Sequence, residues 1–290
     1  MKINNFNQLG SDKYIYIIAE IGINHNGSLD LAKKLIDDAV ETGCDAVKFQ
    51  KRDVSTVYSQ EILDQPRESP WGKTQRDQKE GLEFSLEEYE KIDTYCKEKD
   101  IDWFASSWDN KSQIEMRRFK FKFNKIASAM ATNFEFVELV ASEKIPTFAS
   151  TGMTEMKDIK KLVSIFQKYS CDLMLMHTVS TYPSMESDLN LKCINMLNST
   201  FNLPVGYSGH EVSVSPSIIA ASLGAAAIER HITLDRSMYG SDQSASLQKE
   251  GFRQLTTVCR KLPKVLGNGV KKIISEEKLI ANKLRYWQEQ

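Results

Sequence analysis

The sequence lacks the features that mark several classes of protein. It has only five cysteines in 290 residues, without a Cys-x-x-Cys spacing, and no apolar run is long enough to span a membrane. Its first thirteen residues are polar, so the apolar stretch of a secretory signal peptide is missing. These absences predict reduced thiols in a cytoplasmic protein that does not enter a membrane.

An excess of charge of one sign is also missing. The chain has 38 Lys and Arg residues against 39 Asp and Glu residues, a formal net charge of -1. This balance argues against general nucleic-acid binding, which usually needs a basic excess, but it permits a local basic pocket for a small anion. The sequence also contains no GxGxxG or Walker A motif.

What the sequence does contain is a regular alternation of short β-branched or aromatic runs with longer amphipathic segments. The predicted strands are 14–21, 46–50, 102–107, 123–128, 146–150, 173–179, 203–207 and 226–232. The helices that follow them in turn are 31–40, 86–99, 111–119, 134–142, 156–169, 191–197, 215–223 and 247–262.

Eight strand–helix units predict an α/β protein with a (β/α)₈ TIM-barrel fold. We expect a single barrel domain over residues 1–265, followed by a short helical tail over 266–290 with a helix near 275–287. An open, doubly wound sheet is the alternative. The missing nucleotide-binding glycine motifs make that alternative less favourable.

Polar residues gather where barrel enzymes place their chemistry, at the carboxyl ends of strands. All four histidines (His25, His177, His210 and His231) fall at or just after a predicted strand end, which predicts that they share one face. His210 and His231 end adjacent strands and are the best metal candidates, because neutral imidazoles bind divalent cations. The carboxylates near them are Glu20, Glu211, Glu229 and Asp242.

Two lysines, Lys48 and Lys125, lie inside apolar strand runs. A buried ammonium group needs either an anionic ligand or a carboxylate partner. Hydroxyl groups also accumulate at the strand ends, at Ser106, Ser107, Ser128, Ser150, Thr151, Ser180 and Ser208. Lysines and hydroxyls that converge on one mouth predict a phosphate or carboxylate ligand.

Seven short segments follow one another in a characteristic order. They are IAEIGINHNG at 18–27, VKFQ at 47–50, KIAS at 125–128, STGM at 150–153, HTVSTYP at 177–183, GYSGH at 206–210 and IERH at 228–231. Together they resemble the motifs of the sialic acid synthase family from about residue 14 to residue 262. Each motif alone is weak, and their common order makes the resemblance specific.

The resemblance implies condensation of phosphoenolpyruvate with an open-chain N-acyl hexosamine such as N-acetylmannosamine. The products are a sialic acid-like nonulosonate and phosphate, formed by C–O cleavage. The resemblance also implies a homodimer and a divalent metal, usually Mn²⁺ with Mg²⁺ or Co²⁺ as alternatives, that activates the sugar aldehyde. The implied metal ligands are His210 and His231, which act in catalysis together with Glu20.

The same resemblance assigns the remaining site residues. The positions where the family holds phosphoenolpyruvate are Lys48, Ser107, Lys125, Ser128, Ser180 and Ser208. The positions where it contacts the sugar are Gln50, Tyr182 and Asp242. Two other readings of the residues stay open. One is an aldolase acting on another sugar, and the other is a non-catalytic sugar-binding barrel.

The chain departs from the family pattern at the sugar end. Met130 stands where a carboxylate is usual, and Ser180 stands where an asparagine is usual. The tail after residue 262 is too short for the C-terminal antifreeze-like domain that many members carry. The insertion 59–81 is expected either to cover the mouth or to be an ordinary surface loop. Because no extra basic cluster is obvious, the sequence favours an acceptor without a 6-phosphate.

Overall fold

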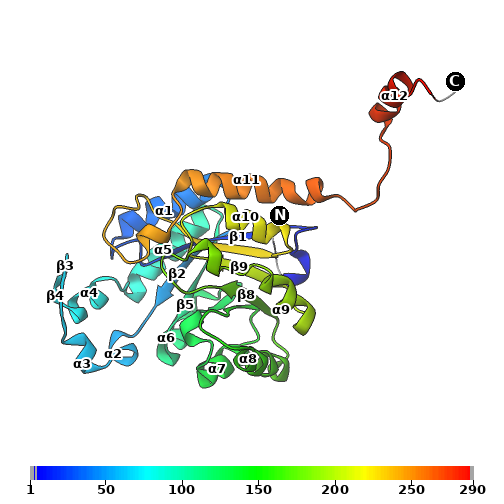
Figure 1. The fold of residues 1–290 in the computed structure, drawn as a ribbon. Coiled ribbons are helices and arrows are strands. Elements are labelled where there is room, and N and C mark those ends of the chain that lie inside the picture. The colour runs from blue at the N-terminus through cyan, green and yellow to red at the C-terminus, as the bar shows by residue number, and fades with distance from the viewer. Residues whose placement is uncertain (1–2, 4, 288–290) are drawn as a thin grey trace.

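Eight parallel strands form a closed barrel in the computed structural model, which describes residues 3 and 5–287 (Figure 1). The strands are β1 (Tyr16–Gly22), β2 (Ala46–Lys51), β5 (Asp102–Ser107), β6 (Asn124–Ile126), β7 (Thr147–Ser150), β8 (Leu173–Thr178), β9 (Val205–Gly209) and β10 (Ala227–His231). Each barrel strand pairs with the next one along the chain, and β10 pairs with β1 to close the ring. The predicted (β/α)₈ barrel is therefore confirmed.

Helices connect the strands on the outside of the barrel (Figure 1). They are α1 (Leu29–Glu41), α5 (Leu86–Glu98), α6 (Asn110–Met116), α7 (Phe134–Ser142), α8 (Met156–Tyr169), α9 (Cys193–Phe201), α10 (Ser215–Ser222) and α11 (Lys249–Leu266). Side-chain capping interactions determine where several of these helices begin. The Ser28 hydroxyl, for example, accepts a hydrogen bond from the Leu31 amide and caps α1.

The insertion between β2 and α5 is folded rather than irregular. It contains α2 (Val54–Val57), α3 (Gln60–Leu63), β3 (Pro66–Ser69), β4 (Gly72–Thr74) and α4 (Gln75–Gly81). The Trp71 ring lies 5.8 Å from the Tyr239 ring, and the Gln78 amide donates to the Tyr239 hydroxyl at 3.2 Å. The insertion therefore packs against the loop that follows β10, although none of its residues lines the cavity at the carboxyl end of the strands.

The N-terminal segment closes the opposite end of the barrel. The 3₁₀ helix η1 (Phe6–Gln8) places the Phe6 ring 5.4 Å from Phe123 and 4.9 Å from Phe148. Tyr16 contacts the same two rings, and all four side chains are buried. Ile3 and Leu9 are buried in the same cluster, so three apolar residues spaced three apart perform a role that the polar composition of the first thirteen residues does not indicate.

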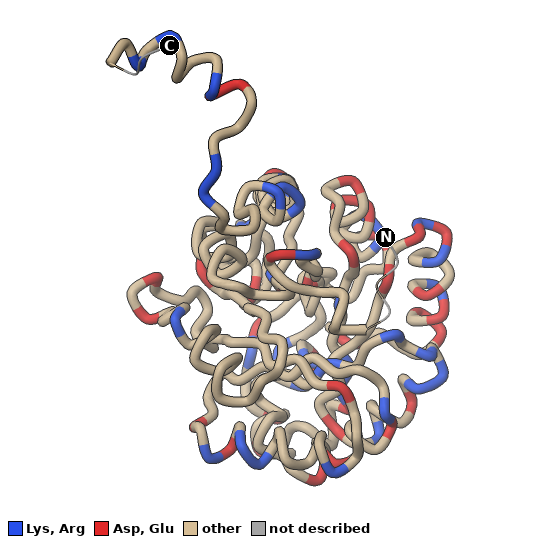
Figure 2. The backbone as a smooth tube through the Cα atoms, turned by 90° about the vertical axis from the view of Figure 1, so that its right-hand side faces the viewer, with Lys and Arg blue, Asp and Glu red and all other residues tan. Residues whose placement is uncertain are grey.

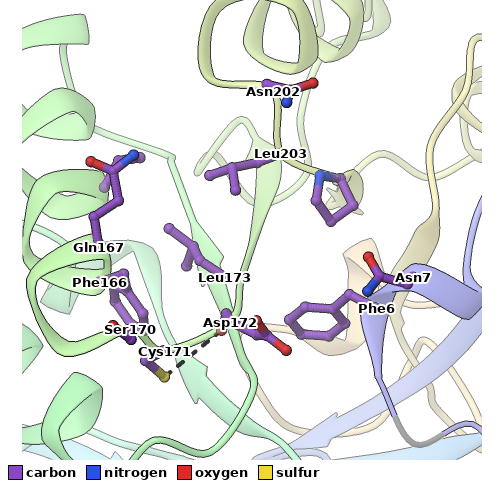
Figure 3. A pocket seen from close by; sticks show the side chains of 12 residues that line it. Phe6, Asn7, Phe166, Gln167, Ser170, Cys171, Asp172, Leu173, Asn202 and Leu203 are labelled. Carbon is purple, nitrogen blue, oxygen red and sulfur yellow. Dashed lines mark hydrogen bonds between the residues drawn. The ribbon is translucent and has the colours of Figure 1, made fainter.

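A hollow of about 380 Å³ also lies at this amino end (Figure 3). Phe6, Phe166, Leu173 and Leu203 give it a largely apolar lining, with Asp172 as its one titratable carboxyl. Among the described residues that line it there is no Lys, Arg or His. The hollow therefore lacks the charged groups that a phosphate or carboxylate ligand would need.

The C-terminal tail leaves the barrel at the same amino end. Near the end of α11, Arg260 bonds to the Ile15 carbonyl, just before β1, and to Asp45, just before β2. The last helix, α12 (Ser275–Leu284), then stands away from the barrel (Figures 1 and 2). Within the described ranges, no helix is both long and apolar enough to cross a membrane.

Candidate active site

A cavity of about 240 Å³ opens at the carboxyl end of the barrel strands. Its lining is Glu20, Lys48, Gln50, Ser106, Trp108, Lys125, Ala127, Ser128, Ala129, Ser150, Met153, Thr178, Ser180, Tyr182, Ser208, His210, Glu229 and His231. The structure thus brings together all of the predicted site residues except Ser107 and Asp242. This cavity is smaller than the hollow at the amino end, but it holds the titratable groups.

Strand alternation explains how these side chains meet. Successive residues of a strand point to opposite faces, so every second residue points into the barrel. In the strand register Glu20 lies level with Lys48 on one side and with His231 on the other. Glu229 precedes His231 by two positions and faces inward with it. The inner charged groups therefore follow directly from the register of β1, β2 and β10.

Two buried lysines are paired with two buried carboxylates. The Lys48 ammonium lies 3.0 Å from Glu229 and 3.2 Å from Glu20. The Lys125 ammonium lies 3.7 Å from Glu229 and donates a 2.6 Å hydrogen bond to the Ser150 hydroxyl. The sequence allowed either an anionic ligand or a carboxylate of the protein as the partner of each buried lysine. The structure shows that carboxylates of the protein are present.

The pKa shifts leave this cluster with a net positive charge. Burial raises the pKa of Glu20 to about 8 although Lys48 opposes the rise, so Glu20 is mostly protonated at pH 7. Burial acts on Glu229 in the same direction, but Lys125 and Lys48 outweigh it and lower the pKa to about 2. Burial lowers the pKa of Lys125 to about 8, which still leaves its ammonium form dominant. Two cations then face one anion, which favours a negatively charged ligand.

Hydroxyl groups line the wall between β6 and β8. The Gly152 amide donates a 3.1 Å hydrogen bond to the Ser128 hydroxyl. A Cβ atom at Gly152 would lie 2.1 Å from the Ser180 oxygen and 2.7 Å from the Ser128 oxygen, so only glycine fits there. The Ser180 hydroxyl is buried without a protein partner. An unpartnered hydroxyl beside a cationic cavity is free to donate to an anion.

The two imidazoles suit a metal ion. The His210 and His231 ring centroids lie 5.5 Å apart. His210 donates from Nδ1 to the Val179 carbonyl at 2.7 Å, which leaves its Nε2 lone pair available. Burial lowers the pKa of His210 to about 4 and that of His231 to about 3, so both rings are neutral. Among the described residues no group of three His, Cys, Asp or Glu could hold a metal, so water and substrate would supply the other ligands.

The predicted sugar-contacting residues surround these imidazoles. The Gln50 amide donates to Glu20 at 3.3 Å, and the Tyr182 ring lies 4.1 Å from the His210 ring. Asp242 is buried outside the cavity lining, with Oδ2 3.8 Å from Nδ1 of His231. Of the three, Gln50 and Tyr182 therefore line the cavity, whereas Asp242 lies beside His231 without a hydrogen bond to it.

Several residues do not take the expected places. His25 stacks on Phe84 with 4.0 Å between ring centroids, and His177 bonds to the Leu189 carbonyl at 2.7 Å. All four histidines lie at or just after the carboxyl end of a strand, as expected, but these two are buried outside the cavity lining. Ser107 is buried outside the lining too. Met130 belongs to the apolar core behind the cavity.

Sequence reasoning assigned no role to several residues that line the cavity, and two of them, Glu229 and Ser106, bear on its chemistry. Glu229 was only one of several nearby carboxylates, yet it contacts both lysines and accepts a 3.1 Å hydrogen bond from Ser208. Ser106, rather than its neighbour Ser107, lines the cavity. Residues two apart on a strand share a face, so Glu229 faces the same way as His231. This alternation was the sequence signal that could have identified Glu229.

The barrel and this mouth define a class of barrel enzymes that bind small anionic substrates at the carboxyl ends of their strands. Residues 35–271 match the model of the NeuB family. Because this match covers most of the chain, the chain belongs to the NeuB family. The recognised resemblance and the expectation of a synthase-type transferase are therefore confirmed.

Named relatives agree with this assignment. The chain is 40% identical to an N-acetylneuraminate-9-phosphate synthase of Drosophila melanogaster over 247 residues, which are 84% of this chain and 66%, just under two thirds, of the relative. It is 35% identical to an N,N'-diacetyllegionaminic acid synthase of Legionella pneumophila, with 93% of this chain and 78% of that one covered. The solved N-acetylneuraminic acid synthetase of Leptospira borgpetersenii superposes with a TM-score of 0.83 at 29% identity, over 95% of this chain and 94% of that one.

Proposed function

We propose that the chain condenses phosphoenolpyruvate with the aldehyde of an open-chain N-acyl hexosamine to give a nonulosonic acid and phosphate. The observation that carries this proposal is the meeting of two buried ammonium groups, those of Lys48 and Lys125, with the hydroxyls of Ser128, Ser180 and Ser208 in one cavity. A small substrate with both a phosphate and a carboxylate group complements that charge. The names of the relatives, which are synthases of N-acetylneuraminate 9-phosphate and of diacetyllegionaminic acid, support the same chemistry.

The anionic substrate fits the inner part of the cavity. Lys48 and Lys125 supply two ammonium groups, and Ser128, Ser180 and Ser208 add hydroxyl donors. We assign the further hydroxyl to Ser106 in place of Ser107, because Ser106 faces the cavity. These groups hold the phosphate and carboxylate while charge moves onto the leaving phosphate.

The acceptor sugar fits the outer part. His210 and His231 are the residues that would hold a divalent cation, with Mn²⁺ proposed first and Mg²⁺ or Co²⁺ as alternatives. When bound, such a cation polarises the aldehyde oxygen as a Lewis acid. Gln50, Tyr182 and Asp242 lie around the imidazoles and orient the sugar chain.

The proton balance assigns a role to Glu20. Carbon 3 of phosphoenolpyruvate forms a bond to the aldehyde carbon, and the aldehyde oxygen takes up one proton to become a hydroxyl. Water adds to carbon 2 and gives up one proton. The C–O bond to phosphate then breaks, the carbon 2 hydroxyl becomes the ketone, and its proton leaves with the phosphate. Glu20 is mostly protonated at pH 7 and lies beside Lys48 and Gln50, so it can donate the first proton and accept the second.

An aldolase that forms a Schiff base is the second candidate. The lowered pKa of Lys125, about 8 because of burial, favours it. Against it stand the 3.7 Å pairing with Glu229 and the hydrogen bond to Ser150, both of which stabilise the ammonium form. Borohydride treatment in the presence of pyruvate would trap an adduct on Lys125 if this candidate were correct.

We extend the proposal to a homodimer in the cytoplasm. All five cysteines are free thiols, which fits a reducing compartment. The exposed apolar side chains of the tail, such as Leu279 and Trp287, offer surface to a second copy. Light scattering of the purified chain measures the assembly directly.

The decisive experiment measures phosphate release from phosphoenolpyruvate with a panel of N-acyl hexosamines, with and without Mn²⁺. We expect release that needs both the acceptor and the metal, and a product whose mass is that of a nonulosonic acid. Phosphoenolpyruvate labelled with ¹⁸O in its C–O–P bridge should yield labelled phosphate, because C–O cleavage leaves that oxygen on phosphorus. Unlabelled phosphate would contradict the mechanism.

His231→Ala should abolish this turnover, because it removes one of the two imidazoles of the cavity. His177→Gln is the matched control, since His177 is a buried histidine outside the cavity lining, and it should keep its activity. Full activity of the metal-stripped His231→Ala protein would overturn the metal assignment.

A further inference from the structure

Three cationic side chains come together beside the mouth. Arg52 directly follows β2, Arg67 lies on β3 and Lys79 lies on α4. Arg52 and Lys79 meet at Tyr58, since Nη1 of Arg52 donates to its hydroxyl at 3.2 Å and the Lys79 ammonium lies 5.2 Å from its ring. Burial lowers the pKa of Lys79, and the charges of Arg52 and Arg67 lower it further. Among the described residues, neither Arg67 nor Lys79 has a carboxylate within ion-pair distance. The cluster therefore carries positive charge that the protein does not neutralise.

The Arg52 guanidinium is held rigidly with one nitrogen left over. Its Nε donates to Glu83 at 2.7 Å, its Nη1 donates to the Tyr58 hydroxyl at 3.2 Å, and its centre lies 5.4 Å from the Trp108 ring. The side chain is only 7% exposed, and its Nη2 is buried without any hydrogen-bond partner. A buried N–H group without an acceptor lowers the stability of the folded state. A ligand that supplies an acceptor would remove this penalty.

The cluster borders the outer, sugar end of the active site. Trp108, on which Arg52 stacks, lines the cavity. Gln78, the neighbour of Lys79 on α4, donates a 3.2 Å hydrogen bond to Tyr239 in the loop that carries Asp242. Burial raises the pKa of Asp242, and the charges of Arg52 and Lys79 are among those that oppose the rise. None of the three cations lines the inner cavity, which separates this cluster from Lys48 and Lys125.

We propose that Arg52, Arg67 and Lys79 bind a phosphate group on the acceptor sugar, at the carbon farthest from its aldehyde. This inference rests on the proposed function, in which the aldehyde lies at the two imidazoles and the sugar chain extends outward past Asp242. A phosphate supplies an acceptor for Nη2 of Arg52 and a counter-charge for the other two cations. The substrate class becomes a 6-phosphorylated N-acyl hexosamine.

This inference reverses the expectation of an unphosphorylated acceptor. That expectation depended on finding no basic cluster in the sequence. The three cations are scattered between residues 52 and 79 among several acidic residues, and only the folded insertion brings them together.

The test compares kcat/KM for each acceptor of the panel with that for its 6-phosphate, using phosphoenolpyruvate and Mn²⁺. We expect the wild-type chain to prefer the phosphorylated form by at least about tenfold. Lys79→Gln and Arg67→Gln, both on the surface insertion, should each lower this preference by about tenfold, the loss of one charge-assisted contact. Lys91→Gln, an exposed lysine on α5, is the matched control and should leave the preference unchanged.

The outcomes separate the two proposals. Turnover that favours unphosphorylated acceptors overturns the phosphate site alone, and so does a preference that survives both substitutions. No phosphate release with any acceptor, phosphorylated or not, overturns the proposed function and this inference together. An unchanged KM for phosphoenolpyruvate in the variants shows that their barrels are intact.

Discussion

Glu20 and Glu229 show how the same residue type acquires two different states a few ångströms apart. Both are buried, and burial alone raises the pKa of a carboxyl group. Glu229 contacts two lysines and stays ionised, whereas Glu20 contacts only Lys48 and has a pKa of about 8. Carboxyl groups whose environments push their pKa values apart are typical of acid–base chemistry. The proposed mechanism accordingly uses Glu229 as a counter-ion for the lysines and Glu20 as the group that carries protons.

His25 gives a pH dependence that can be measured separately from activity. Burial, with a further contribution from Arg52, lowers its pKa from 6.5 to about 3. The unfolded chain therefore binds a proton between these values that the folded chain does not, and stability is lost as the pH falls below about 6.5. Wild type should lose unfolding free energy between pH 6.5 and 5.0 as the unfolded chain binds this proton. We expect His25→Gln to reduce that loss by about 2 kcal/mol.

Urea titrations of both proteins at the two pH values measure this difference. His177, His210 and His231 also have lowered pKa values because of burial, so the variant should keep a weaker dependence of the same sign. An identical pH dependence in wild type and variant would show that His25 is not the neutral, buried group described.

Sequence motifs identified most residues of the cavity because each motif ends a strand, and strand ends converge in a barrel. They failed where the answer depended on side-chain direction or on folding of the insertion. Ser106 and Ser107 are chemically equivalent in sequence, and only the alternation along β5 decides which one faces inward. The position of Arg52 against Trp108 depends on tertiary packing, which no local pattern encodes.

At the scale of elements, η1 (Phe6–Gln8) covers the amino end of the barrel and shields its core from solvent. The barrel strands were predictable because their apolar runs alternate with amphipathic segments, but Ile3, Phe6 and Leu9 are isolated among polar residues and form too short a pattern to detect. We expect Phe6→Ala to lower the free energy of unfolding by about 3 kcal/mol, because it leaves a cavity between Phe123 and Phe148.

Urea unfolding checks this prediction, with Asn7→Ala as the neighbouring control. Asn7 is exposed and should change the free energy by less than about 0.5 kcal/mol. A loss below about 1 kcal/mol in Phe6→Ala would show that the rest of the barrel closes without this ring.

At the scale of the whole molecule, the tail and the active site lie at opposite ends. Helix α11 delivers the chain to the amino end of the barrel, where Arg260 bonds to the residues that precede β1 and β2. The tail therefore begins far from its own barrel's mouth. The folded insertion lies at the other end, where Trp71 and Gln78 pack against Tyr239 in the loop after β10.

This arrangement predicts that the barrel folds and binds substrate without the tail. A chain ended at Gly267 should keep the free energy of unfolding within about 0.5 kcal/mol and the KM for phosphoenolpyruvate unchanged, because the side chains of α12 are exposed. Leu262→Ala, in the buried part of α11, is the contrasting variant and should cost about 2–5 kcal/mol. A truncation that costs as much as Leu262→Ala would mean that the tail packs on the barrel. A truncation that changes only the mass measured by light scattering would place the tail between two copies, where its exposed apolar residues would then be buried.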